Sequence, residues 1–108
     1  MRTMKLGSSP LEVSRIAFGC MRLSADRGEA LRSIRGALDQ GITMFDHADI
    51  YGRGQREETF AAIWKELPGL RERVILQSKC GIRPADAPAG APGRYDFSRE
   101  HILASVDG

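Results

Sequence analysis

The sequence predicts an α/β fold built around a parallel β-sheet, and two observations support this. Apolar stretches and amphipathic stretches alternate in the order strand, helix, strand, helix, strand, at spacings of roughly thirty residues, as right-handed strand–helix–strand crossovers require. The stretch 42–45 is apolar and lies between Gly41 and the carboxylate of Asp46. Such a short apolar run with a β-branched start is typical of an interior strand.

The elements follow in order along the chain. Residues 4–13 predict a hairpin around the turn formers Gly7–Pro10, and residues 15–19 predict a short strand. An amphipathic helix is expected over 27–40, with Asp26 as its N-cap and Gly41 just beyond its end.

A second helix is expected over 55–67, with Phe60 and Trp64 in the core, and Pro68-Gly69 ends it. The third strand is expected over 74–79. A sheet of three parallel strands needs cover on both of its faces. The helices expected here can cover only one face.

Residues 82–97 are rich in Pro, Ala, Gly and Asp and contain little to bury. The pattern predicts a long mobile loop, which serves as a lid or as a linker, at the same edge of the sheet as Asp46 and Tyr51. A third helix is expected to begin after the N-cap Ser98.

Composition limits the class of protein. The chain has 108 residues, of which 42% are hydrophobic and 28% are charged, so it suits one small globular domain over 1–108. Its net charge of +2 is scattered, which argues against a nucleic-acid partner. The N-terminus resembles no signal peptide and no apolar run is long enough for a membrane span, so a cytoplasmic chain is expected. Cys20 and Cys80 are expected to be free thiols.

Groups able to exchange protons cluster where the central strand ends. Asp46, His47, Asp49 and Tyr51 lie within six positions, and Lys79 ends the next strand. Neighbouring parallel strands lie about 5 Å apart, so Lys79 can approach Asp46 and Tyr51. A nearby ammonium stabilises a phenolate, and Asp46 would keep the lysine charged. Tyr51 is therefore predicted to act as a general acid, for example toward a carbonyl oxygen.

A metal-dependent hydrolase that uses Asp46, His47 and Asp49 is an alternative interpretation of this cluster. Consecutive residues of a strand face opposite ways, so Asp46 and His47 converge poorly on one ion. His47 is predicted to point away from Asp46 as a packing or supporting group, and no metal is expected.

The pattern Phe45-Asp46-x-Ala48-x-x-Tyr51-Gly52, followed by Ser78-Lys79 at a strand end, resembles the aldo-keto reductase superfamily. The resemblance covers nearly the whole chain, and the residues of these motifs are similar to those of bacterial oxidoreductases of the family. It implies a (β/α)8 TIM barrel, of which residues 1–108 would form the N-terminal hairpin, which plugs the barrel bottom, and about the first three βα units.

The resemblance also implies site roles. Tyr51 would be the general acid, Lys79 would tune it, and Asp46 would orient the lysine, while Gly19, Cys20, Met21 and Asp46 would lie near the nicotinamide of NADPH. The substrate would be a small aldehyde or ketone. An alternative within the superfamily is a nucleotide-binding regulatory subunit with little turnover, as the potassium-channel β subunits are.

The chain departs from the family pattern in two respects. The histidine that ends the fourth strand has no counterpart, since His101 falls in a predicted helix, and the loops that bind the adenine and phosphate are missing. Because such a barrel takes about 250 residues, these 108 residues alone are expected to be inactive. The oligomeric state is not predicted.

Overall fold

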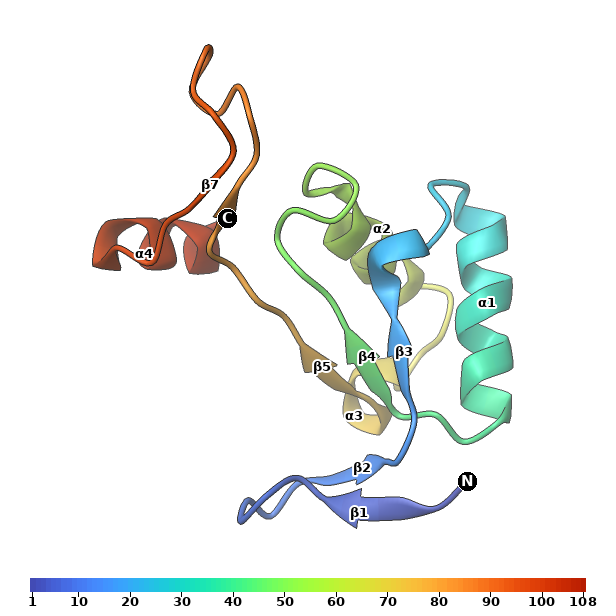
Figure 1. The fold of residues 1–108 in the computed structure, drawn as a ribbon. Coiled ribbons are helices and arrows are strands. Elements are labelled where there is room, and N and C mark those ends of the chain that lie inside the picture. Colours follow the sequence, from blue (N-terminus) through green and yellow to red (C-terminus); the bar gives the residue numbers. More distant parts are fainter.

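The computed structural model describes residues 1–108 and contains a three-stranded parallel sheet. Its strands are β3 (Ala17–Gly19), β4 (Met44–Asp46) and β5 (Ile75–Gln77), in the spatial order β3-β4-β5. Helices α1 (Arg27–Asp39) and α2 (Gln55–Ile63) cover one face of the sheet (Figure 1). The predicted α/β class and the central place of the second parallel strand are confirmed.

The predicted N-terminal hairpin is present as β1 (Thr3–Lys5) and β2 (Glu12–Ser14), paired antiparallel. It lies at the end of the sheet where the parallel strands begin (Figure 1). Ser14 and Thr43 join the two sheets, because the backbone N–H of each donates to the side-chain oxygen of the other, at 3.1 and 3.0 Å.

Helix α1 begins and ends where the sequence predicts. The carboxylate of Asp26 accepts a hydrogen bond of 2.8 Å from the Glu29 N–H, and the Gly41 N–H donates to the Leu38 carbonyl at the other end. A short 3-10 helix, η1 (Cys20–Arg22), precedes it and was not predicted.

The core lies between the sheet and the two helices. The rings of Phe45 and Phe60 are both buried, with centroids 5.1 Å apart. Trp64, which was expected in the core, is 36% exposed, so this prediction is wrong. Because α2 ends at Ile63, Trp64 caps the helix at the rim of the core. The buried cluster comprises Cys20, Leu23, Ala30, Ile34, Ala37, Phe45, Phe60, Ile63, Leu70 and Val74.

The other face of the sheet carries the polar strand ends. Side chains alternate along a strand, so Phe45 faces the helices while Met44 and Asp46 face the opposite side. In register with Asp46 lie Gly19 on β3 and Gln77 on β5. Neither α1 nor α2 covers this face (Figure 1).

Two regions differ from the expectation. A short helix, α3 (Leu70–Arg73), follows Gly69, and the segment expected as a loop over 82–97 contains a hairpin of β6 (Ile82–Arg83) and β7 (Arg94–Tyr95). Its strands are two residues long, which is too short for a sequence period to reveal.

The last element, α4 (Arg99–Asp107), begins after Ser98 as predicted, and the Ser98 hydroxyl accepts a hydrogen bond of 3.2 Å from the His101 N–H. It lies beyond β5, apart from α1 and α2 (Figure 1). No helix in the chain has both the length and the apolar character needed to cross a bilayer.

Candidate active site

Asp46 and Lys79 form the centre of the site. The Lys79 ammonium donates to both carboxylate oxygens of Asp46, at 3.0 and 2.8 Å, and to the backbone carbonyl of His47 at 2.7 Å. With 47% of the lysine side chain and 28% of the aspartate side chain exposed, the pair can be reached from solvent. The structure thus brings together the two strand ends that the sequence predicts to meet.

Tyr51 lies beside this pair. The Lys79 Nζ lies 4.8 Å from the centroid of the Tyr51 ring, a distance that permits a cation–π contact. Asp46 and Tyr51 therefore both lie next to the Lys79 ammonium, so the three predicted catalytic side chains form one cluster.

The turn after Tyr51 depends on glycine. Gly52 has a φ of +59°, and a Cβ there would lie 2.8 Å from the guanidinium carbon of Arg56. The Arg56 N–H in turn donates to the Tyr51 carbonyl at 3.2 Å. The chain can therefore turn directly after Tyr51 and start α2 while the phenol stays at the strand edge.

The surroundings of Lys79 favour its charged form. Partial desolvation lowers the pKa of the ammonium, but the hydrogen bonds and charge of Asp46, together with the proximity of Tyr51, outweigh it and raise the pKa above 10.5. Lys79 therefore carries its positive charge throughout the physiological pH range.

Gln77 was missed by sequence reasoning. Its side-chain amide donates to Asp46 Oδ1 at 2.9 Å, so it helps Lys79 to hold the carboxylate in place. The signal was available, since Gln77 precedes Lys79 by two positions in the strand predicted over 74–79, where the two side chains share one face.

The residues predicted near a nicotinamide differ in accessibility. Gly19 and Met21 are exposed at the edge that carries Asp46, whereas Cys20 is fully buried. Burial, and to a smaller degree the charge of Asp46, raises the pKa of the Cys20 thiol to about 12. Cys20 is thus a neutral core thiol, and neither it nor Cys80 forms a disulfide.

His47 points away from Asp46, as predicted. It is 4% exposed, and its ring packs edge-on against Phe60 with a centroid distance of 4.9 Å. Neither ring nitrogen has a hydrogen-bond partner. Burial lowers the pKa of His47 below 6.5, with Lys79 acting in the same direction and the carboxylates of Glu57 and Asp46 opposing it.

We expect His47 to make the fold sensitive to acid. The unfolded chain takes up a proton at His47 near pH 6.5 while the folded chain resists it, so stability is lost as pH falls from 6.5 toward the lower pKa of the folded state. Each pKa unit of difference contributes about 1.4 kcal/mol. The measurement is the free energy of unfolding at pH 7 and pH 5. The loss should shrink in His47→Phe but persist in the matched change His101→Phe, and an equal loss in both variants would contradict it.

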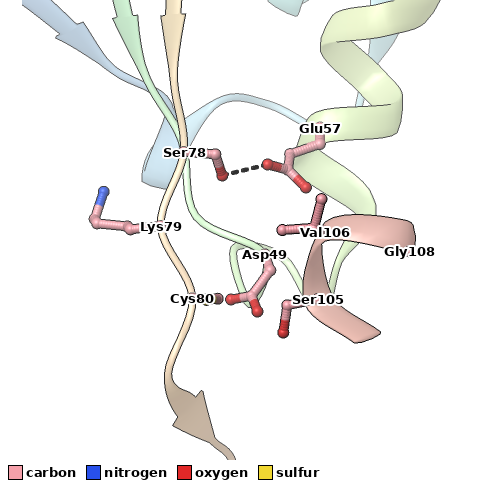
Figure 2. A pocket seen from close by; sticks show the side chains of 8 residues that line it. All are labelled: Asp49, Glu57, Ser78, Lys79, Cys80, Ser105, Val106 and Gly108. Carbon is pink, nitrogen blue, oxygen red and sulfur yellow. Dashed lines mark hydrogen bonds between the residues drawn. The ribbon is translucent and has the colours of Figure 1, made fainter. Parts of the chain in front are cut away.

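The cavity in Figure 2 and the Lys79 ammonium lie on opposite sides of the segment that follows β5. It has a volume of about 440 Å³, and inside it Ser78 donates a hydrogen bond of 2.5 Å to Glu57. Lys79 contributes to its wall, but its side chain points away from it (Figure 2). This cavity is therefore separate from the Asp46–Lys79–Tyr51 cluster. Its lining residues are Asp49, Glu57, Ser78, Lys79, Cys80, Ser105, Val106 and Gly108.

The structure does not favour a metal site of Asp46, His47 and Asp49. No three His, Cys, Asp or Glu side chains converge in a way that could hold an ion. Asp46 and His47 project to opposite faces, which is the physical reason that the sequence already suggested.

Comparison with known proteins identifies the family to which the chain belongs. Residues 15–108 match the Aldo/keto reductase family, and the chain belongs to that family. Its fold is the N-terminal part of the family's (β/α)8 barrel.

Particular relatives support this assignment. The chain is 42% identical over 102 residues to the uncharacterized oxidoreductase YcsN of Bacillus subtilis, covering 90% of this chain and 34% of that protein. It is 38% identical to a 6-dehydroglucose reductase of Agrobacterium fabrum, covering 93% and 36%.

Among solved structures, the holo form of aldo-keto reductase AKR11C1 from Bacillus halodurans matches with a TM-score of 0.81 and 34% identity, covering 99% of this chain and 34% of that one. The chain thus spans about a third of the length of its relatives.

Proposed function

We propose that the full-length protein transfers hydride between NADP(H) and a small aldehyde or ketone. The observation that carries this proposal is the Lys79 ammonium, which binds Asp46 at 2.8 Å and lies 4.8 Å from the Tyr51 ring centroid. The membership of the chain in an oxidoreductase family supports the same class of reaction.

In this proposal Tyr51 is the general acid. Its hydroxyl donates to the carbonyl oxygen as hydride reaches the carbonyl carbon, so the product is an alcohol and Tyr51 is left as a phenolate. The Lys79 ammonium stabilises this phenolate, and Asp46 keeps the lysine protonated and oriented. In alcohol oxidation the same groups act in reverse.

A nicotinamide dinucleotide would supply the hydride when bound, and the strand edge fits its nicotinamide end. Gly19 is in register with Asp46, and the space where its Cβ would lie is open to 4 Å. A flat ring could therefore approach the backbone there. Gly19, Met21 and Asp46 would contact that end, and Cys20 would support it from the core.

The proposal is tested by NADPH oxidation with the full-length protein and a panel of aldehydes, ketones and oxidised sugars, the last because one relative is a 6-dehydroglucose reductase. We expect turnover with at least one carbonyl compound, and none from residues 1–108 alone. NADPH binding without turnover on any member would favour the regulatory-subunit alternative. Failure to bind NADPH or NADH would contradict both.

A further inference from the structure

The segment 77–79, in which β5 ends, contacts other elements on both of its sides. Side chains alternate along an extended segment. Gln77 and Lys79 point to one side, where both donate to the Asp46 carboxylate. Ser78 points to the opposite side, where its hydroxyl donates to the carboxylate of Glu57 (Figure 2). The contact with Glu57 therefore holds the segment from the side that faces away from the catalytic cluster.

Glu57 belongs to the first turn of α2, and this turn also holds the loop that carries Tyr51. The N–H of Arg56, the preceding residue, donates to the Tyr51 carbonyl at 3.2 Å. The helix is anchored in the core by Phe60, which is 2% exposed. One helical turn therefore contacts the Tyr51 loop through its backbone and Ser78 through a side chain.

Backbone hydrogen bonds also hold the segment 77–79, against the chain that follows β4. The His47 N–H donates to the Gln77 carbonyl at 2.7 Å. The Asp49 N–H donates to the Lys79 carbonyl at 3.1 Å. These two bonds flank Ser78 and set the distance between the two stretches of chain. The rotation of the segment about its own axis depends on its side-chain contacts, and such a rotation would move the Lys79 ammonium.

We propose that Glu57 is a positioning residue, which acts through Ser78 on Lys79 and so sets the place of the ammonium beside Tyr51. This inference rests on the proposed function. A hydrogen bond to a carboxylate is roughly twice as strong as one between neutral groups. The attraction between the ammonium and the phenolate falls with distance, so a displaced ammonium stabilises the phenolate less. Loss of Glu57 or of the Ser78 hydroxyl slows the proton-transfer step and leaves cofactor binding unchanged.

The first test measures kcat for carbonyl reduction and the Kd for NADPH, both with the full-length protein. Glu57→Ala and Ser78→Ala should each lower kcat about tenfold, within the loss of about a hundredfold that a displacement of about 1 Å can cause. The Kd for NADPH should stay within about twofold of the wild-type value. Glu57→Gln keeps an oxygen acceptor and Ser78→Thr keeps a hydroxyl, so both variants should recover most of the wild-type kcat.

The second test shows whether the effect passes through Lys79. In a Lys79→Met background, Ser78→Ala should change kcat by less than about twofold, because the group that it positions is already absent. The matched control is Glu58→Ala, which removes the neighbouring, exposed carboxylate from the same turn of α2. Its kcat should equal that of the wild type.

Three results would each overturn the positioning role. They are a Ser78→Ala variant with kcat within about twofold of the wild type, an equal loss of kcat from Ser78→Ala in the Lys79→Met background, and a rise in the Kd for NADPH that matches the fall in kcat. All three leave wild-type turnover, and so the proposed function, intact. Absence of wild-type turnover with every carbonyl compound would instead overturn the proposed function, and the positioning role with it.

Discussion

Replacing Tyr51 with Phe should lower kcat for carbonyl reduction by about a hundred- to ten-thousand-fold, the usual contribution of a general acid. The substitution removes one oxygen and keeps the ring that lies 4.8 Å from the Lys79 ammonium. Without the phenol, the proton needed by the developing alkoxide must come from water. The measurement is steady-state NADPH oxidation with the best substrate of the panel.

Binding separates this effect from a loss of structure. The Kd for NADPH should stay within about threefold of the wild-type value, since Phe keeps the packing that surrounds Tyr51. Thr59→Val, the loss of a hydroxyl on α2 away from the Asp46–Lys79–Tyr51 cluster, serves as the comparison and should retain turnover. A Tyr51→Phe variant with near-normal kcat would remove Tyr51 from the role of general acid.

The contact between Asp46 and Lys79 was predictable because the order of the elements allows few sheet topologies. Three strands joined by helices form a parallel sheet, and the ends of neighbouring strands then meet at one edge. Asp46 and Lys79 occupy such ends, so their contact followed from the order of the elements. Tyr51 lies in the loop that follows Asp46, so its approach to Lys79 followed from the same strand ends, and the family resemblance implied the same role for it.

Other features depend on contacts that no local pattern encodes. The hairpin of β6 and β7 is fixed by the Arg83–Asp96 ion pair and by Phe97 over Gly81, which join residues more than ten positions apart. Trp64 sits in an amphipathic stripe but falls beyond the helix end at Ile63, and helix ends are the least certain part of any sequence pattern.

Replacing Lys79 with Met should lower kcat by about a hundred- to a thousandfold, comparable to the loss of one preorganised charged donor. Met has an unbranched apolar side chain of similar length and lacks the ammonium. The phenolate of Tyr51 would then form without a neighbouring cation, while Asp46 would lose its ion-pair partner and keep only the hydrogen bond from Gln77. Both changes disfavour proton donation by Tyr51.

The pH profile tests the cause of that loss. In the wild type the pKa of Lys79 is raised above 10.5, so its stabilising charge is present at neutral pH and is lost only as pH rises through that higher value. Wild-type kcat should therefore fall in strongly alkaline solution as the cation is lost, and Lys79→Met, which has no such cation to lose, should give a different alkaline profile. Lys65→Met, the same change at an exposed lysine outside the site, should leave kcat and its pH profile as in the wild type. Equal profiles for Lys79→Met and the wild type would show that the ammonium holds structure rather than tuning Tyr51.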